Sequence, residues 1–211
     1  MQKTVPSNSQ PPTQPPIQTP TQPPTQPPAQ PSVQKWTLLS SEMAFEHRWY
    51  RLRKDTVALP NGTVIDDFFV SERPNIATIL PITADGQVVF VRQYRHGVGE
   101  ILLELPAGTF EIGEEPLAVA QRELAEETGY VSDEWDAIAT FYNSPVKQTN
   151  RIHLFRAQNV RVAQAQKLDI TEQIEVVTKP ISQVSQLIAT GEICVSGTIT
   201  ALLLGLGQEL R

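Results

Sequence analysis

Residues 108–130 constrain this chain more than any other stretch, and they read GTFEIGEEPLAVAQRELAEETGY. Within them, apolar residues recur at the spacing of one helix face, at Leu117, Ala120 and Leu124. Pro116 suits the first turn of a helix, and Gly129 suits the position just past its end. The segment therefore predicts a helix over 116–128 with one buried stripe.

The predicted helix carries three carboxylates, Glu123, Glu126 and Glu127, at offsets that place them on one face. Glu123 and Glu127 lie four residues apart, and a like-charge pair at this spacing destabilises an isolated helix by about 0.2–0.5 kcal/mol. The last turn is also where the helix dipole disfavours negative charge. A solvated acidic surface is the ordinary explanation of such a run. The alternative is a bound hard cation, because Mg²⁺ prefers oxygen ligands.

The spacing of the polar and glycine residues favours the cation. The residues at fixed spacing are Gly108, Glu114, Arg122, Glu123, Glu126, Glu127 and Gly129. This arrangement resembles the Nudix box, the signature of hydrolases that cleave nucleoside diphosphates linked to another moiety. Every fixed position is met, and the one soft departure is Tyr130, where an aliphatic residue is usual. We expect Gly108 and Gly129 to supply backbone freedom.

The flanking sequence narrows the resemblance to the ADP-ribose pyrophosphatase branch. Residues 91–115, the pair Ser144-Pro145 and residues 152–157 are all similar to that branch. The resemblance implies hydrolysis of ADP-ribose to AMP and ribose 5-phosphate by a homodimer whose N-terminal strands help to build the partner's site. Two alternatives stay open: a hydrolase of another nucleoside diphosphate sugar or dinucleotide, and a module that binds ADP-ribose without cleaving it.

The resemblance also implies a divalent metal, which can bridge phosphate oxygens and activate water. It implies Glu123 and Glu127 as ligands of Mg²⁺, with Mn²⁺ as an alternative metal, and Glu126 as a ligand or a positioner of water. The backbone carbonyl of Ala107 is a further implied ligand. Arg122 is expected to orient the glutamates through salt bridges.

The general base is less clear from the sequence. Related ADP-ribose enzymes can carry a glutamate in the loop after the Ser-Pro pair, but residues 146–150 read VKQTN and contain no acid. Glu172 and Glu175, in the next acidic segment, are the replacement candidates. Water activated by the metal without a side-chain base is the alternative.

Arginines near the predicted helix are candidates for binding the pyrophosphate, because a guanidinium matches phosphate in a bidentate way. Arg92 and Arg95 lie three residues apart on one predicted strand, so they point to opposite faces. The resemblance favours Arg95, and Arg73 is a weaker candidate. Trp49 is a candidate to stack on adenine, although an aromatic residue near a strand is more often part of the core.

The first 34 residues differ in kind from the rest. They hold 11 of the 18 prolines, eight glutamines and one charged residue, Lys3. Such a sequence has too little apolar surface to offset the entropy of ordering, so we expect a disordered tail that is either a spacer or dispensable. A Pro-rich docking ligand is the alternative, although the basic residues that often accompany such ligands are absent nearby. Residues 35–211 then form the hydrolase domain, with an N-terminal strand region over 35–72 and a catalytic core over 73–211.

Residues 35–211 carry all 23 acidic residues of the chain, and every lysine and arginine except Lys3. This acidic balance argues against general nucleic-acid binding. The apolar runs fall short of the roughly 20 residues needed to span a bilayer. Cys194 is the single cysteine, so a reducing, cytoplasmic compartment is expected, with Cys194 as a small core residue.

Short β-branched or apolar runs bounded by turn residues predict strands. They cover residues 49–59, 63–71, 76–82, 88–94, 101–105, 137–141, 152–157 and 174–177. Two closing helices are expected over 181–189 and 198–206. This mixture predicts an α+β fold. The resemblance implies a Nudix-type α/β/α sandwich, with a mixed sheet between helices and a small N-terminal strand region.

Overall fold

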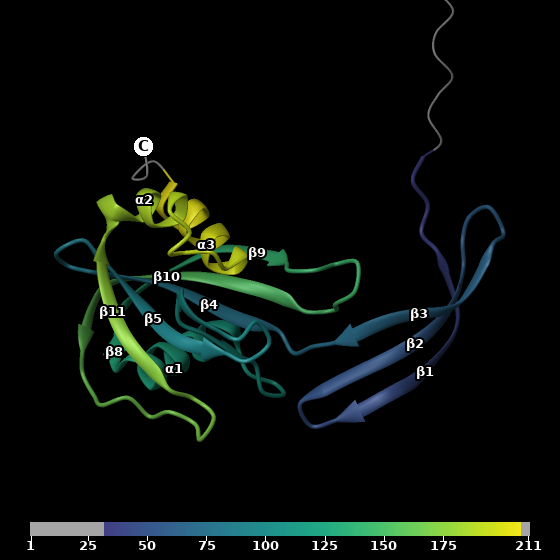
Figure 1. Cartoon of the computed structure of the whole chain (residues 1–211), viewed down its shortest axis with the longest axis horizontal. Coiled ribbons are helices and arrows are strands. Elements are labelled where there is room, and N and C mark those ends of the chain that lie inside the picture. Colours follow the sequence, from purple (N-terminus) through teal and green to yellow (C-terminus); the bar gives the residue numbers. More distant parts are fainter. Residues whose placement is uncertain (1–31, 208–211) are drawn as a thin grey trace, which may run out of the picture. The chain divides into compact units, whose positions relative to one another are not determined.

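The computed structural model describes residues 32–207. The expectation of a disordered tail over 1–34 therefore falls almost entirely outside the described residues. Residues 35–211 form one compact unit. Its described part contains a three-stranded antiparallel sheet, a larger mixed sheet and three α-helices (Figure 1).

The three-stranded sheet consists of β1 (Thr37–His47), β2 (Tyr50–Ala58) and β3 (Val64–Glu72), paired in that order. The strands β2 and β3 lie where the sequence predicts them. The strand β1 was not expected as a separate element, because its residues lack a clear apolar and polar alternation. All eleven of its residues are exposed. The sheet therefore leaves β1 without cover from the rest of the described chain.

Eight strands form the mixed sheet. They are β4 (Ile76–Thr83), β5 (Gln87–Arg95), β6 (Glu100–Glu104), β7 (Ala107–Thr109), β8 (Tyr130–Val131), β9 (Glu134–Tyr142), β10 (Arg151–Val162) and β11 (Ile174–Pro180). The central pair β4 and β10 is parallel, and the other pairs are antiparallel. The strands β7 and β8 are too short to give a sequence signal.

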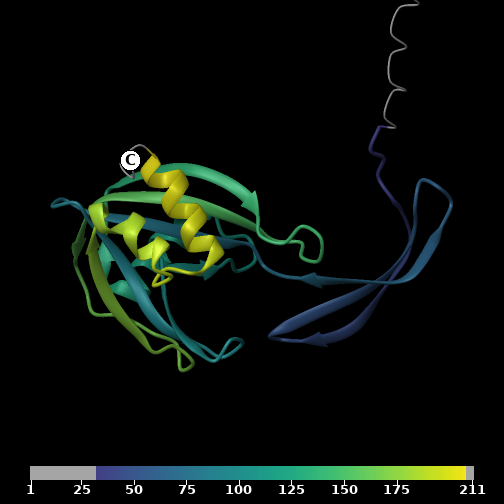
Figure 2. The same cartoon turned by 45° about the horizontal axis from the view of Figure 1, so that its top comes forward.

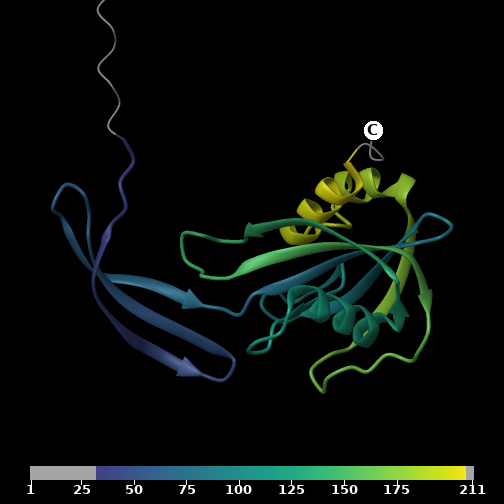
Figure 3. The same cartoon turned by 180° about the vertical axis from the view of Figure 1, so that it is seen from behind.

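Both faces of the mixed sheet are covered. Leu80 and Phe90 belong to one buried cluster with residues of α2 (Val184–Ala189) and α3 (Ser196–Leu206). Ile79 and Val89, the neighbours of these residues along β4 and β5, pack with α1 (Pro116–Thr128) on the opposite face. Figure 2 shows α2 and α3 across one face, and Figure 3 shows α1 in front of the other. The expected α/β/α sandwich is confirmed.

The helix α1 spans Pro116–Thr128, as the sequence predicts. It ends because Gly129 adopts a left-handed conformation, with φ of 75°, from which its N–H donates to the Ala125 carbonyl oxygen. Val119, Ala120 and Leu124 are fully buried. Leu117 was expected in the buried stripe and is exposed instead, because it lies in the first turn, beside the exposed residues that precede the helix.

Two details at the C-terminal end differ from expectation. A 3₁₀ turn (Ile181–Gln183) precedes α2, so the predicted single helix over 181–189 begins with a tighter turn. Cys194 is exposed rather than buried, because it lies in the connection between α2 and α3, where Ile193 takes the core position. Across residues 32–207, no helix combines the length and the apolar character that crossing a bilayer requires.

Candidate active site

The three glutamates of α1 lie at the end of the helix that packs under the sheet. Their side chains are largely withdrawn from solvent: Glu123 is 12% exposed, Glu126 is 28% exposed, and Glu127 is 4% exposed as a residue. A solvated acidic surface would leave such carboxylates exposed. The burial therefore excludes the ordinary explanation of a Glu-rich helix.

Glu127 is the most deeply placed of the three. The Ala107 N–H donates a hydrogen bond of 3.0 Å to its Oε2. Burial, together with the charges of Glu123 and Glu172, raises the pKa of Glu127 to about 8, against the Ala107 hydrogen bond and the charge of Arg95, which both lower it. Burial also raises the pKa of Glu123, against the influence of Arg122. Positive charge at this site would relieve the crowding of these carboxylates.

Gly108 is required by space. A Cβ atom built on Gly108 would overlap the carboxyl group of Glu123. From the sequence, Gly108 was expected to be needed for a backbone conformation that other residues disfavour. Gly108 does not adopt the left-handed conformation. The loop backbone therefore runs directly against the Glu123 carboxylate, which no other residue type would permit without displacement.

Arg122 holds the acidic residues together. Its Nη1 donates to Glu123 at 2.7 Å and to Glu126 at 3.3 Å. Its Nε and Nη2 donate to the two carboxylate oxygens of Glu114. Glu114 in turn accepts the Glu111 N–H at 2.7 Å, so it ties the preceding loop to the helix. These are the salt bridges expected of Arg122.

These residues line a cleft of about 360 Å³. Its wall consists of Ala107, Gly108, Thr109, Glu111, Arg122, Glu123, Glu126, Lys167, Leu168, Asp169 and Glu172. The cleft holds five carboxylates and two cationic side chains, and Glu127 lies behind it. Its charge suits a cation first and an anionic ligand only when that cation is present.

The segment between β10 and β11 closes the cleft from the far side. The Lys167 N–H donates to the Glu126 carbonyl oxygen at 2.9 Å. The Gln166 side chain donates to the carbonyl oxygens of Glu127 and Ile174, at 2.6 and 3.3 Å. These contacts use carbonyl groups that the end of a helix leaves without partners. They fix the start of the segment against α1.

The structure separates the two candidate bases. Glu172 lines the acidic cleft and accepts the Asp169 N–H at 2.9 Å. Glu175 lies on β11, where it pairs with Arg92 of β5 at 3.1 Å, and it does not line the acidic cleft. Strand alternation directs Glu175 to Arg92, so the structure does not bring it to the site.

A second cleft of about 360 Å³ shares Ala107, Gly108 and Thr109 with the acidic cleft. Arg73 and Arg95 both line it, together with the start of α3. Arg95 uses Nε and Nη2 to bind Glu104, at 2.7 and 3.1 Å, so only Nη1 is free of that pair. The two clefts therefore adjoin at residues 107–109.

Trp49 does not line either cleft. It lies in the turn between β1 and β2, it is 67% exposed, and the Arg48 guanidinium stacks over its ring at 4.8 Å. The expectation that an aromatic residue here is usually core does not hold for Trp49.

Three residues that shape the site were not expected from the sequence: Gln166, Lys167 and Glu104. Gln166 and Lys167 belong to a stretch without periodicity, which gives no sign of contact with α1. Glu104 precedes the Nudix-like box by a few residues, but its pairing with Arg95 depends on the register of β5 and β6.

The donor atoms of the site fit a hard divalent cation. Carboxylate oxygens of Glu123 and Glu126 line the cleft, Glu127 adjoins it through the Ala107 N–H, and no sulfur or imidazole is among the lining residues. Within residues 32–207, no three His, Cys, Asp or Glu side chains already converge as a ligand set. Arg122 and the Ala107 N–H hold the carboxylate oxygens instead, so metal binding requires Arg122 to yield contacts.

Comparison with known proteins identifies the class. Residues 72–190 match the NUDIX domain, and residues 36–71 match the nucleoside diphosphate sugar hydrolase N-terminal domain. The chain therefore belongs to the Nudix family of hydrolases.

Two relatives and one solved structure illustrate the likeness. An ADP-ribose pyrophosphatase of Bacillus subtilis is 32% identical, over 78% of this chain and 89% of that protein. A GDP-mannose pyrophosphatase of Citrobacter koseri is 35% identical, over 80% of this chain and 94% of that protein. The crystal structure of an ADP compounds hydrolase, 22% identical, has a TM-score of 0.74 and covers 83% of this chain and 94% of its own; it supports the fold.

Proposed function

We propose that this enzyme hydrolyses the pyrophosphate bond of ADP-ribose to AMP and ribose 5-phosphate in a Mg²⁺-dependent reaction. The acidic cleft is the observation that carries the proposal, because it gathers Glu123, Glu126 and Glu172 around the Gly108 backbone. The likeness to an ADP-ribose pyrophosphatase over most of both chains supports this substrate.

Glu123, Glu126 and Glu127, with the carbonyl of Ala107, would hold Mg²⁺ or Mn²⁺. When bound, the metal neutralises phosphate charge and lowers the pKa of water. Arg122 would then give up its contacts with Glu123 and Glu126 and keep those with Glu114. The buried position of Glu127 keeps one ligand fixed, since its Oε2 is oriented by the Ala107 N–H.

Glu172 is the proposed general base. The oxygen of the attacking water forms a bond to one phosphorus, and the bond from that phosphorus to the bridging oxygen breaks. The bridging oxygen leaves with the electron pair on the second phosphate, and the water proton passes to the Glu172 carboxylate. The Asp169 N–H orients that carboxylate, which lies in the same cleft as the metal-binding glutamates.

The adjoining cleft is the proposed place for the rest of the substrate. Arg95 and Arg73 supply positive charge there, and the free Nη1 of Arg95 is suited to a phosphate oxygen. Glu104 keeps the guanidinium of Arg95 in one orientation through two hydrogen bonds. We propose that Trp49 stacks on adenine in the site of a partner subunit.

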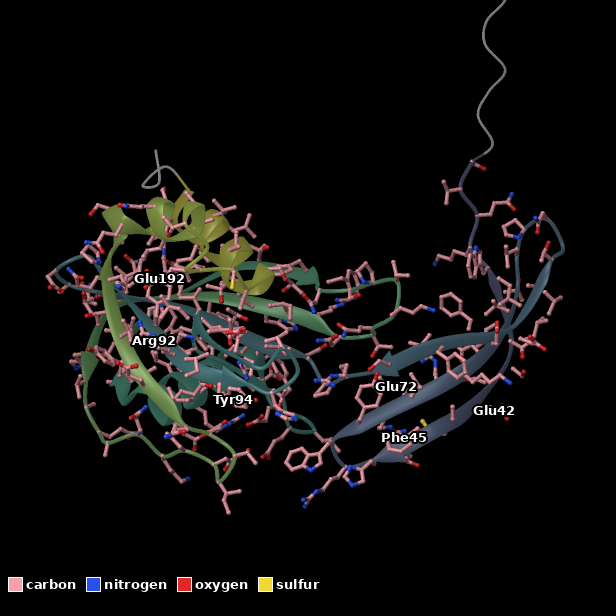
Figure 4. The ribbon with its side chains drawn as sticks, viewed as in Figure 1. Glu42, Phe45, Glu72, Arg92, Tyr94 and Glu192 are labelled. Atoms are coloured by element: carbon pink, nitrogen blue, oxygen red, sulfur yellow. The ribbon has the colours of Figure 1, made fainter. Side chains whose placement is uncertain are left out.

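A homodimer would give Trp49 that role. The N-terminal sheet exposes Leu38, Leu39, Met43, Phe45 and Trp49, and Figure 4 shows Phe45 and Glu42 along β1. Apolar side chains gathered in this way on one small sheet are typical of an interaction surface. A second copy of the chain is the proposed partner. We further propose a cytoplasmic location, because a single cysteine suits a reducing compartment.

A substrate panel tests the proposal. ADP-ribose, GDP-mannose and other nucleoside diphosphate sugars would be incubated with the enzyme and Mg²⁺, and the products read as phosphate after treatment with a phosphatase. ADP-ribose is expected to give the highest kcat/KM. A preference for GDP-mannose would support the second candidate, which the likeness to a GDP-mannose pyrophosphatase favours. Binding of ADP-ribose without turnover would indicate a binding module, which the intact glutamates argue against.

A further inference from the structure

Lys167 has a fixed backbone at the rim of the acidic cleft. Its N–H is bound to the Glu126 carbonyl oxygen at 2.9 Å. The preceding Gln166 side chain holds the Glu127 and Ile174 carbonyl oxygens, and Gln164 donates to the Ala125 carbonyl oxygen at 3.3 Å. The root of the Lys167 side chain is therefore held beside the end of α1 even though its ammonium group is free to move.

The two cationic side chains of the cleft, Arg122 and Lys167, differ in how many of their N–H donors are free of hydrogen bonds. Every nitrogen of the Arg122 guanidinium is engaged, with Glu114, Glu123, Glu126 or the Thr109 carbonyl oxygen. Lys167 makes one long contact, from Nζ to Glu126 Oε1 at 3.5 Å, and its side chain is 82% exposed. Of the two, Lys167 is the one with unused N–H donors.

A bound cation would loosen the contact between Lys167 and Glu126. Glu126 Oε2 already accepts from Arg122, and Oε1 faces Lys167. Positive charge added at these carboxylates repels the ammonium group and competes for Glu126. A pyrophosphate in the same cleft offers oxygens of higher charge, and the flexible four-carbon stem of lysine lets Nζ reach them.

We propose that Lys167 binds a phosphate oxygen of the nucleoside diphosphate substrate. The inference rests on the proposed function and adds a substrate-binding residue to it. Lys167 stands at the Glu172 side of the cleft, whereas Arg73 and Arg95 line the adjoining cleft beyond Gly108. The substrate is thus held by cations from both clefts.

A simpler role would be to neutralise Glu126. The two roles predict different behaviour when the charge is removed. Without a phosphate contact, Lys167→Met would leave nucleotide binding unchanged and would strengthen Mg²⁺ binding, because Glu126 would lose a competing cation. With the phosphate contact, the same change weakens nucleotide binding.

The experiment uses the full chain with saturating Mg²⁺. We expect Lys167→Met to lower kcat/KM for ADP-ribose by about tenfold to a hundredfold, the effect of losing a hydrogen bond to a charged group. Calorimetry with the α,β-methylene analogue of ADP-ribose, whose bridging carbon prevents cleavage, should show a similar loss of affinity. Lys167→Arg should keep most of both. Lys179→Met is the control, because Lys179 pairs with Glu192 at a similar distance, 3.4 Å, and lines neither cleft.

The outcomes are separable. Suppose that the wild type is active and that Lys167→Met matches it within twofold in kcat/KM and in analogue affinity. The proposed role of Lys167 would then be overturned, and the proposed function would stand. Tighter Mg²⁺ binding by that variant in a thermal-shift titration, with unchanged analogue affinity, would assign Lys167 to neutralising Glu126. A wild type that neither cleaves ADP-ribose nor binds the analogue would refute the proposed function, and this inference with it.

Discussion

Ala107 and Glu127 are joined by a hydrogen bond from the backbone N–H of the first to Oε2 of the second, at 3.0 Å. The bond links β7, which enters the Nudix box, to the last turn of α1, which ends it. The hydrogen bond joins two residues that are 20 positions apart in the sequence. The Gly108 backbone packs against the Glu123 carboxylate next to this bond. The geometry of the glutamates therefore depends on the loop as much as on the helix.

Glu127→Gln should nearly abolish turnover of ADP-ribose while the fold stays intact. The change removes the charge of a buried ligand but keeps its volume and one oxygen. The measurement is kcat at saturating Mg²⁺, with circular dichroism as a check on folding. Glu115→Gln is the matched control, since Glu115 is exposed and makes no side-chain cap at the start of α1. Wild-type activity of Glu127→Gln at limiting Mg²⁺ would remove Glu127 from the proposed ligands.

The apparent affinity for Mg²⁺ should fall as the pH is lowered from 8 to 6. Glu127 has a pKa of about 8 in the metal-free protein, so below that pH the metal must displace a proton. One displaced proton weakens binding by about tenfold per pH unit. Titration of Mg²⁺ at pH 6, 7 and 8, followed by thermal unfolding, measures this. Midpoints that do not move with pH would contradict it.

The ionisation of Glu127 also contributes to how the free energy of unfolding of the metal-free protein depends on pH. The folded-state pKa of Glu127 is raised above its ordinary value of 4.5, so the folded state holds a proton that the unfolded state releases between those limits. Stability of the metal-free protein should therefore decline as pH rises from about 5 toward 8, and Mg²⁺ should restore it most strongly at pH 8. Glu127→Gln should lose this component of the pH dependence.

Glu172→Gln should lower kcat by about 10²–10⁴-fold, the usual contribution of a general base, with little change in KM. Glu175→Gln should stay within a few-fold of wild type, because its carboxylate is paired with Arg92 on the sheet. Steady-state kinetics of both variants with ADP-ribose make the comparison. If both variants behave alike and stay near wild type, water is activated without either carboxylate.

Gly108→Ala should lose most of its activity, because the added methyl group would displace the Glu123 carboxylate. Kinetics and thermal unfolding should be measured together, since the displacement costs stability as well. Gly97→Ala is a suitable control: a Cβ there meets nothing within 4 Å. A Gly108→Ala enzyme with normal kcat would show that Glu123 can move without loss of function.

Light scattering on the full chain should give about twice the chain mass. Phe45→Asp should reduce that mass and raise KM for ADP-ribose, because it places a charge on the exposed apolar surface of β1 and removes Trp49 from the partner's site. Glu42→Gln, on the same strand, is the control. A fully active wild-type monomer would eliminate the shared site.

The sequence predicted α1 and its glutamates well, because helical periodicity, Pro116 and Gly129 all favour the same element. It could not choose between Glu172 and Glu175, since the direction of each side chain depends on how the segment after β10 returns to the sheet. It predicted a strand region over 35–72 but did not separate β1 as an element, because the exposed residues of β1 lack a clear alternation of apolar and polar side chains. The sequence also could not predict the close contact between Gly108 and Glu123, because this contact forms only when β7 packs against α1.

Hydrogen bonds from Gln164, Gln166 and Lys167 to the last carbonyls of α1 also bear on how this protein can change through evolution. Insertions or deletions within 163–167 would shift the donors out of register with the helix and carry Glu172 away from the cleft. The stretch that follows, before Glu172, makes no such contacts with α1 and can vary in length more freely. Homologous sequences should therefore keep the number of residues from the end of β10, at Val162, to Lys167 more strictly than the number from Lys167 to Glu172.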